Sequence, residues 1–188
     1  LSDKYVVLET SDPLAGLEVG LVREGSPAVF RDSSTTAYDD IVYWYWDFGD
    51  GTTMEGVEDP VHTYTMGGSF HVVHTVRDSD HNEDTIDIWV DVERVLPRVS
   101  FSITGARVEG VTLQLTSTSQ SHNQIASMNW TFDDGTYAAG GPELGQVQKA
   151  YGSQGWYYIT LTVVEADGDV NSTTTMVFEP GITCVVGP

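Results

Sequence analysis

The chain has 188 residues, which is enough for one large domain or for two domains of about 90 residues each. Its 28 acidic and 8 basic residues give a net charge of -20, so binding to nucleic acid or to an anionic membrane surface is not expected. Cys184 is the single cysteine, which excludes an internal disulfide and a cluster of thiolate ligands.

The acidic composition allows two interpretations of the source. The chain has Lys4 and Lys149 as its lysines, and acidic charge with so little lysine indicates a halophilic organism, whose abundant salt screens the repulsion. The alternative is an ordinary acidic secreted protein. No segment is typical of a signal peptide or a membrane span, so direct membrane insertion is not expected. Because the chain starts at Leu1 rather than Met, we expect a processed or partly represented protein.

The first half of the chain begins with residues 1–12, which contain the short apolar run 5–8. We interpret this segment as a linker or as the last strand of a preceding domain. Two strands are then predicted over 17–22 and 28–30, with the turn residues 24–27 between them.

The stretch 41–51 predicts a strand that runs into a tight hairpin turn. Successive side chains of a strand point to opposite faces, so this strand has a core face and an outer face. The core face is predicted to carry Val42, Trp44, Trp46 and Phe48, and the outer face Tyr43, Tyr45 and Asp47. The turn is supplied by Gly49, Asp50 and Gly51, because Asp-Gly tolerates the positive φ of tight hairpins.

Residues 52–63 are predicted to form a polar loop, and two further strands follow it. The strand over 70–76 is predicted to turn Phe70, Val72, His74 and Val76 to the core. The strand over 86–92 is predicted to turn Ile86, Ile88, Val90 and Val92 to the core. A boundary is expected at Leu96-Pro97.

The pattern then repeats, so the chain is predicted to contain two copies of one unit. The strands of the second copy are predicted over 99–103, 111–115, 125–135 and 155–163. Trp130 aligns with Trp46, and Tyr157 aligns with Phe70 after an insertion in the loop 136–150. The predicted division is a linker at 1–12, one β-sandwich at 13–94, a second at 95–180 and a tail at 181–188.

Three motifs carry a resemblance to a known family: the run 46–51, the segment Pro60-Val-His-Thr-Tyr64, and the segment 68–80. In order and spacing they resemble the polycystic kidney disease (PKD) family of immunoglobulin-like domains. The resemblance implies an all-β fold, with two tandem immunoglobulin-like β-sandwiches of PKD type. It also implies a structural role for a set of signature residues: Trp46, Phe48, Gly49, Asp50, Gly51, His62, Tyr64, Trp130, Phe132, Asp134, Gly135 and Tyr151. The second copy departs from the pattern at Thr131, Asp133 and Lys149, where the first copy has Asp47, Gly49 and His62.

An enzyme is not expected, because no motif of a catalytic nucleophile, a zinc protease or a phosphate-binding loop is present. His71 and His74 are three residues apart on a strand, so they point to opposite faces and cannot share a metal ion. His74 is predicted to be buried in the core, and His62 is predicted to pack and hydrogen-bond near Tyr64.

Calcium is the candidate cofactor. Asp78, Asp80, Asn82 and Asp84 place oxygen ligands close together in one turn, and hard cations prefer oxygen ligands. The second copy offers Glu165, Asp167 and Asp169 at the corresponding place, and the resemblance implies that some members of the family bind calcium. The alternative is a solvated acidic hairpin. No other cofactor is expected.

Two N-x-[ST] sequons, at Asn129 and Asn171, are candidate glycosylation sites. Asn171 is expected in a polar turn before the last strand. Asn129 is expected on the outer side of the strand that contains Trp130, where a glycan would be more crowded.

Aromatic side chains on the outer faces indicate an interaction patch. The predicted members are Tyr43, Tyr45, Val73 and Trp89 in the first copy, and Trp156 and Tyr158 in the second. A contiguous exposed apolar patch usually marks an interface. We expect contact with neighbouring domains or copies of the same surface protein, with polysaccharide stacking and an unpartnered surface as alternatives.

The sequence therefore predicts a non-catalytic extracellular segment that spaces and assembles a cell-surface protein. The alternatives are an accessory carbohydrate- or protein-binding module of a secreted hydrolase, and a decoration or fibre protein on the virion surface of a halophilic archaeal virus.

Overall fold

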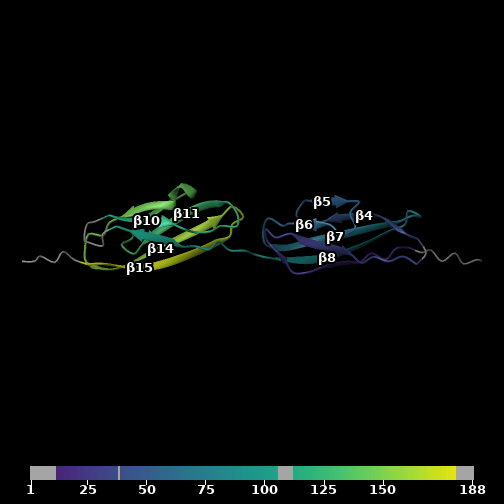
Figure 1. The fold of residues 1–188 in the computed structure, drawn as a ribbon, viewed down its shortest axis with the longest axis horizontal. Helices are drawn as coiled ribbons and strands as arrows, with labels where there is room; N and C mark the ends of the chain where they lie inside the picture. Colours follow the sequence, from purple (N-terminus) through teal and green to yellow (C-terminus); the bar gives the residue numbers. More distant parts are fainter. Residues whose placement is uncertain (1–11, 38, 106–111, 181–188) are drawn as a thin grey trace, which may run out of the picture. The chain divides into compact units, whose positions relative to one another are not determined.

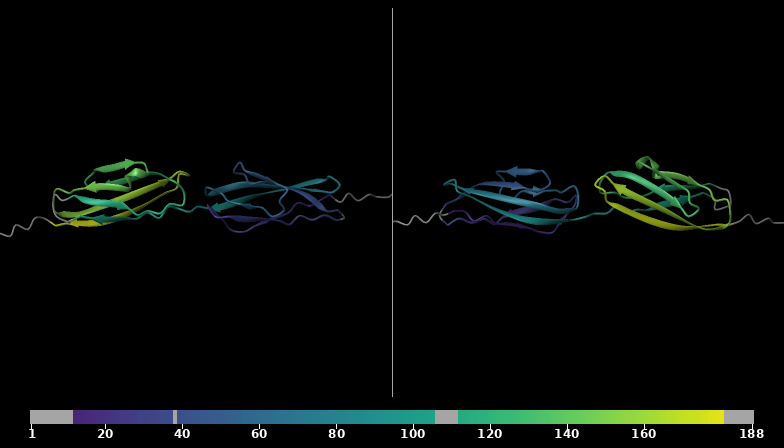
Figure 2. Two further views of the ribbon diagram at one scale, coloured as in Figure 1. Left: turned by 45° about the horizontal axis from the view of Figure 1, so that its top comes forward. Right: turned by 180° about the vertical axis from the view of Figure 1, so that it is seen from behind.

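The computed structural model describes residues 12–37, 39–105 and 112–180, and the chain divides into two compact units. The first unit comprises residues 1–94 and the second comprises residues 95–188. Each unit is built from two facing β-sheets, as Figure 1 and Figure 2 show. The predicted all-β fold with two tandem β-sandwiches is confirmed. Within the described ranges, no helix is both long and apolar enough to span a membrane.

The first unit contains one sheet of five strands and one of three. The five-stranded sheet has the order β2 (Val22–Arg23), β8 (Glu83–Glu93), β7 (Gly68–Asp78), β4 (Ile41–Asp47) and β5 (Thr53–Glu55). The three-stranded sheet has the order β1 (Leu17–Val19), β3 (Ala28–Asp32) and β6 (Val61–His62). The loop predicted over 52–63 therefore contains two short strands, β5 and β6, which belong to different sheets.

The single strand predicted over 17–22 is wrong, because it is two strands on different sheets. β1 runs antiparallel to β3, whereas β2 runs parallel to β8. Gly20 and Leu21 lie between them and are exposed. This crossing from one sheet to the other lets one short stretch of chain close the edges of both.

The inward placement of Val42 is also wrong. The register between β4 and β7 shifts between Ile41 and Tyr43, so Val42 is an extra residue without a cross-strand partner. Such a β-bulge breaks the alternation of side chains locally, and Val42 is 55% exposed. From Tyr43 onward the predicted alternation holds, with Trp46 and Phe48 fully buried.

The core of the first unit is centred on Trp46. Its ring lies 6.1 Å from that of Phe30 and stacks at 3.6 Å on the ring of His74. Its indole Nε1 donates to the carbonyl of Val57 at 3.0 Å, so the one polar atom of the buried ring is satisfied. Full burial of a side chain of this size contributes about 1.5–3 kcal/mol.

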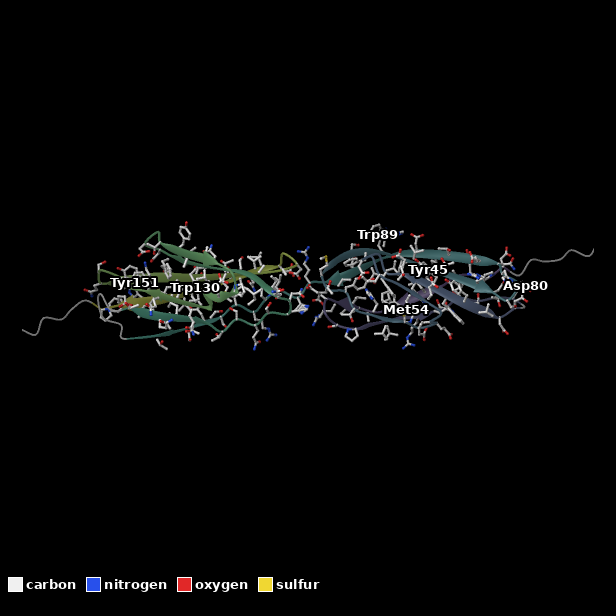
Figure 3. The ribbon with its side chains drawn as sticks, turned by 90° about the horizontal axis from the view of Figure 1, so that it is seen from above. Tyr45, Met54, Asp80, Trp89, Trp130 and Tyr151 are labelled. Carbon is white, nitrogen blue, oxygen red and sulfur yellow. The ribbon has the colours of Figure 1, made fainter. Side chains whose placement is uncertain are left out.

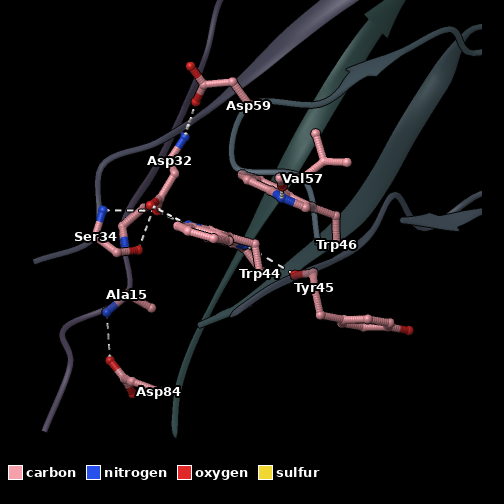
Figure 4. Close-up of polar contacts among 11 residues, drawn as sticks. Ala15, Asp32, Ser34, Trp44, Tyr45, Trp46, Val57, Asp59 and Asp84 are labelled. Atoms are coloured by element: carbon pink, nitrogen blue, oxygen red, sulfur yellow. Dashed lines mark hydrogen bonds and ion pairs between the residues drawn. The ribbon is translucent and has the colours of Figure 1, made fainter. Parts of the chain in front are cut away.

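The predicted burial of His74 is confirmed, and the structure supplies its partner. His74 Nε2 lies 3.0 Å from Asp32 Oδ1, and Trp44 Nε1 donates to Asp32 Oδ2 at 2.8 Å, as part of the network in Figure 4. Burial would raise the pKa of Asp32, but hydrogen bonds from Ser34, Trp44 and His74 outweigh it and hold the pKa below its ordinary value. The network ties β3 to β4 and β7 across the two sheets.

The second unit repeats this architecture, with four described strands in its larger sheet instead of five and with one short added helix. Its four-stranded sheet has the order β12 (Tyr137–Gly140), β11 (Ile125–Phe132), β14 (Gly155–Glu165) and β15 (Val170–Glu179). Its three-stranded sheet has the order β13 (Gln146–Lys149), β10 (Leu113–Ser117) and β9 (Phe101–Thr104). The insertion predicted as the loop 136–150 is structured: it holds β12, the short 3-10 helix η1 (Pro142–Gly145) and β13.

Trp130 takes the place of Trp46 in the second core. It is fully buried, and its Nε1 donates to the carbonyl of Leu144 in η1 at 2.9 Å. Tyr151 stacks at 3.8 Å on Tyr157, beside the same core. Figure 3 shows Trp130 and Tyr151 within the second unit, whereas Trp89 projects from the first. The repeat therefore preserves the buried aromatic centre of each sandwich.

Candidate interaction surfaces

The outer face of the five-stranded sheet, here called the Trp89 face, carries the aromatic residues predicted for the first copy. Tyr43 lies opposite Arg77, whose guanidinium sits 4.4 Å from the centre of the tyrosine ring. Arg77 Nε in turn donates to Glu83 Oε1 at 2.7 Å. Tyr43 and Tyr45 are both half-buried in this arrangement. Tyr43 is therefore partly covered by a charged pair of its own sheet.

Trp89 stands apart from the two tyrosines on that face. It is 68% exposed, and its ring lies 5.0 Å from the ring of His71. His71 Nε2 lies 2.8 Å from Asp87 Oδ2, which fixes the imidazole beside the indole. Between Tyr45 and Trp89 lies a cross-strand row in which Val73 has Asp47 on one side and Asp87 on the other. The predicted residues thus share one face, but charged side chains lie among them.

The outer face of the four-stranded sheet, here called the Trp156 face, is built differently. Trp156 lies opposite Phe178, with ring centres 4.9 Å apart, and Tyr158 lies opposite Met176. Trp156 is 60% exposed and Tyr158 is 51% exposed. These two cross-strand rows are neighbours along the sheet and form a continuous apolar end of the face.

Sequence reasoning missed His71, Met176 and Phe178 as members of these surfaces. Each is the direct cross-strand neighbour of a predicted aromatic residue. The alternation within one strand tells which side chains point outward, but it does not tell which residue of the next strand lies opposite. The register of the hairpin β14–β15, counted outward from its turn at 166–169, is the signal that would have found Met176 and Phe178.

Three of the predicted calcium ligands of the first unit, Asp78, Asn82 and Asp84, take part in hydrogen bonds of the fold. Asp78 is buried, and its Oδ1 accepts from the backbone N–H groups of Asp80 and Asn82, both at 2.9 Å. Asp78 Oδ2 accepts from the side-chain amide of Asn82 at 3.1 Å. Asp84 Oδ2 accepts from the backbone N–H of Ala15. Burial would raise the pKa of Asp78, but these hydrogen bonds from Asn82 and Asp80 hold the pKa below its ordinary value.

Glu165 occupies the place of Asp78 in the second unit. Its Oε1 accepts from the hydroxyl of Ser121 and from the backbone N–H groups of His122 and Asn123. Its Oε2 is buried, with no hydrogen-bond partner among the described residues. Asp167 accepts from the side-chain amide of Asn123. Calcium binding stays a prediction for both loops, and calorimetric titration of the chain with calcium tests it.

The signature turn that follows β4 is held by side-chain hydrogen bonds. His62 stacks at 4.1 Å on Phe48, and its Nε2 lies 2.8 Å from Asp50 Oδ2. Burial would raise the pKa of Asp50, but hydrogen bonds from Thr52 and His62 hold the pKa below its ordinary value. Tyr64 donates its hydroxyl to the carbonyl of Phe48 at 2.9 Å, and its own pKa is raised by burial.

A cavity of about 400 Å³ opens beside this turn, a feature that the sequence did not predict. His62, Met66 and Phe70 are among the residues that line it.

The corresponding turn of the second unit uses an ion pair instead. Lys149 Nζ donates to Asp134 Oδ2 and Thr136 Oγ1, and it sits 4.8 Å from the centre of the Phe132 ring. The ammonium of Lys149 lowers the pKa of Asp134 to about 2. A lysine and a histidine thus brace the same turn through the same aspartate position.

The family model of the PKD domain matches residues 11–92 and again residues 97–179. The chain belongs to the PKD family. The two matches cover the two units, and the PKD domain is a non-catalytic module.

Known relatives of this pair of PKD domains include a metalloprotease and a collagenase. The chain is 30% identical over 171 residues to the pre-pro-metalloprotease PrtV of Vibrio cholerae, a match that covers 90% of the chain and 18% of PrtV. It is 40% identical over 75 residues to collagenase ColQ1 of Bacillus cereus, covering 39% of the chain and 8% of the collagenase. The chain thus spans less than a fifth of the curated relatives it matches.

Among solved structures, two single PKD domains resemble this chain. The PKD1 domain of V. cholerae PrtV is 32% identical, with a TM-score of 0.40. The match covers 44% of the present chain and 98% of the PrtV domain. The PKD1 domain of Vibrio anguillarum Epp is 25% identical, with a TM-score of 0.43. The match covers 46% of the present chain and 100% of the Epp domain.

The two sequons fall on strands of the second PKD unit. Asn171 is exposed but lies in β15 rather than in the predicted turn, and its Nδ2 donates to the carbonyl of Pro97 at 2.9 Å. A glycan would have to displace that hydrogen bond. Asn129 lies in β11 between buried neighbours, and its Oδ1 is buried. Glycosylation stays a prediction, which a comparison of intact mass with sequence mass tests.

Proposed function

We propose that this pair of PKD domains is a non-catalytic extracellular segment, which spaces and assembles the domains of a surface or secreted protein through protein–protein contacts. The observation that carries the proposal is Trp89, a tryptophan 68% exposed on an outer sheet face between Asp87 and Asp91. Covering such a ring removes a large apolar area from water, worth about 1.5–3 kcal/mol.

The surroundings of Trp89 define the partner surface. The ring of His71 lies 5.0 Å from the indole, tilted by 40°, and widens the contact area. The carboxylates of Asp87 and Asp91 flank it in the same strand and favour a partner with basic groups, because opposite charges across an interface select the partner and speed the encounter. Trp, Tyr and Arg are the residues most enriched at energetic centres of interfaces. The partner is therefore a neighbouring domain or protein of the same extracellular assembly, with arginine or lysine at its contact surface.

A second candidate function is an accessory module of a secreted hydrolase. The relatives named as a metalloprotease and a collagenase favour it, since in both the matching part is a small share of a much longer protein. A catalytic domain elsewhere in the full-length gene would support this alternative. In either case the extracellular location rests on the same relatives.

The test compares Trp89→Ala with Trp156→Ala in the full-length protein. We expect Trp89→Ala to weaken assembly by about tenfold, which corresponds to the burial of part of the ring, while its circular dichroism and melting temperature stay unchanged. Sedimentation velocity of the native assembly gives the measurement, with Trp156→Ala as a matched exposed tryptophan. If Trp89→Ala unfolds the first unit, the outward register is wrong. If assembly is unchanged, Trp89 is not at the contact.

A further inference from the structure

The Trp156 face differs from the rest of this acidic chain because the outward positions on its strands carry no charge. Cross-strand register places the outward residues of four strands side by side. The described outward residues are Tyr137 and Ala139 on β12, Ser127, Asn129 and Thr131 on β11, Trp156, Tyr158, Thr160, Thr162 and Val164 on β14, and Val170, Ser172, Thr174, Met176 and Phe178 on β15. None of them is ionisable at neutral pH. One exposed carboxylate does border the face: Asp133, in the turn after β11, lies beside Tyr158 and accepts from its backbone N–H at 3.0 Å.

This neutrality is specific to the second PKD unit. The Trp89 face, which has the same position on the first sandwich, carries charged side chains in most of its rows: Asp47, Glu55, Arg77, Glu83, Asp87 and Asp91. The two faces come from the same fold and the same strand pairing. The fold itself therefore does not require an uncharged face.

The face is graded along its strands. At one end lie the two apolar rows, Trp156 with Phe178 and Tyr158 with Met176. The next row pairs the hydroxyls of Thr160 and Thr174, which lie 2.8 Å apart. From Trp156 to Thr162 the strand runs about 20 Å at about 3.3 Å per residue. The result is a strip with flat rings at one end and neutral hydroxyls along the remainder.

We propose that the Trp156 face binds a neutral polysaccharide chain lying along β14 and β15. The exposed rings of Trp156 and Tyr158 would stack on the apolar faces of sugar rings, since a flat aromatic surface offers dispersion and apolar burial together. The threonine rows would exchange hydrogen bonds with sugar hydroxyls. A charged side chain on such a strip would have to be desolvated by a ligand that offers no counter-charge, which is costly. The absence of charge at these outward positions is thus what an uncharged, hydroxyl-rich ligand requires.

A protein partner fits this face less well. Protein interfaces combine an apolar centre with a polar rim, and they are enriched in Arg. Here the apolar side chains stand at one end rather than at the centre, and the described strands of the face carry no arginine. The net charge of -20 also opposes an acidic polysaccharide. A neutral glycan is the ligand that these observations favour.

The experiment is a depletion assay of the chain on insoluble microcrystalline cellulose, chitin and starch, with alginate beads as the anionic comparison. We expect retention on at least one neutral polysaccharide and none on alginate. Trp156→Ala should weaken retention by about tenfold, the effect of losing one stacked ring. Thr174→Glu, an exposed substitution that places one charge on the strip, should weaken it also. Trp89→Ala, on the other unit, should leave it unchanged.

Salt gives a second reading of the same assay. Because no charged group takes part, retention should be the same in about 0.01 M and about 1 M salt. If the chain binds none of the three neutral polysaccharides, the proposal is overturned. Equal loss in Trp89→Ala and Trp156→Ala, or release by salt, would also overturn it. Circular dichroism of each variant separates loss of the site from loss of the fold. If Trp156→Ala is destabilised, weaker retention of Thr174→Glu supports the proposal and unchanged retention overturns it.

Discussion

The two PKD units share a core and differ in their surfaces. Trp46 and Trp130 are both fully buried, and each donates its indole N–H to a backbone carbonyl, that of Val57 between β5 and β6 or that of Leu144 between β12 and β13. The charge is distributed very differently: residues 1–94 hold 20 acidic and 5 basic residues, a net charge of -15, whereas residues 95–188 hold 8 and 3, a net charge of -5. The two units therefore use the same residue type at the centre of the core, whereas the residues on their outer faces differ.

The largest effect is expected for the buried tryptophans. Trp46→Ala should destabilise the first unit, and Trp130→Ala the second, by about 3–5 kcal/mol each, because truncation loses apolar burial and leaves a cavity. Calorimetry of the whole chain should show each variant lowering one transition and sparing the other. A single transition that both variants lower equally would mean that the units unfold together.

The next largest loss of stability is expected for replacement of Gly49 in the signature turn of the first unit. The corresponding turn of the second unit has Asp133 at this position. The φ of Gly49 is +76°, and a Cβ there would lie 2.4 Å from the carbonyl oxygen of His71. Gly49→Ala should therefore cost more than about 2 kcal/mol, since strain in the left-handed region adds to a clash with backbone.

Gly51→Ala is the matched control for Gly49→Ala. Gly51 has φ of +90° but nothing within 4 Å of the added Cβ, so its replacement should cost only the strain, about 1–2 kcal/mol. Urea unfolding of both variants gives the comparison. Equal costs would show that the close approach of β7 to this turn does not matter.

The sequence predicted well which side chains of the regular strands face the core. It did not predict the bulge in β4 or the change of sheet between β1 and β2. Alternation placed Phe70, Val72, His74 and Val76 on one face because a regular strand repeats every two residues. It failed at Val42, where a bulge adds a residue, and at 17–22, where the chain changes sheets. Both events depend on pairing with distant strands, which local pattern does not encode.

The interaction surfaces were predictable only in part, for the same reason. Trp89, Trp156 and Tyr158 were placed outward by alternation. Their neighbours Met176 and Phe178, and the continuous uncharged face, depend on the register between β14 and β15 and on the pairing with β11.

The salt response should differ between the units. At about 0.1 M salt the Debye length is about 10 Å, so carboxylates on one sandwich still repel one another. The transition that Trp46→Ala lowers belongs to the unit with net charge -15, and it should rise more with molar salt than the other transition. Equal responses, or none, would count against the halophilic interpretation.

The smallest effect concerns the ion pair of the second turn. In the folded chain the pKa of Asp134 is lowered to about 2 from its ordinary value of 3.8, chiefly by Lys149. Stability from this pair is present above about pH 4 and is lost as pH falls toward 2. Lys149→Met should flatten that decline in the second transition, and the first transition serves as internal control. An unchanged pH profile would show that the pair contributes nothing.

We expect the two copies of one fold to present two different contact surfaces, one for assembly and one for polysaccharide. Trp89→Ala and Trp156→Ala, measured side by side for assembly of the full-length protein and for retention on neutral polysaccharide, test this expectation most directly. We predict opposite outcomes: Trp89→Ala weakens assembly and keeps retention, and Trp156→Ala keeps assembly and weakens retention. If both variants change the same property, or neither changes any, the two faces do not have separate roles.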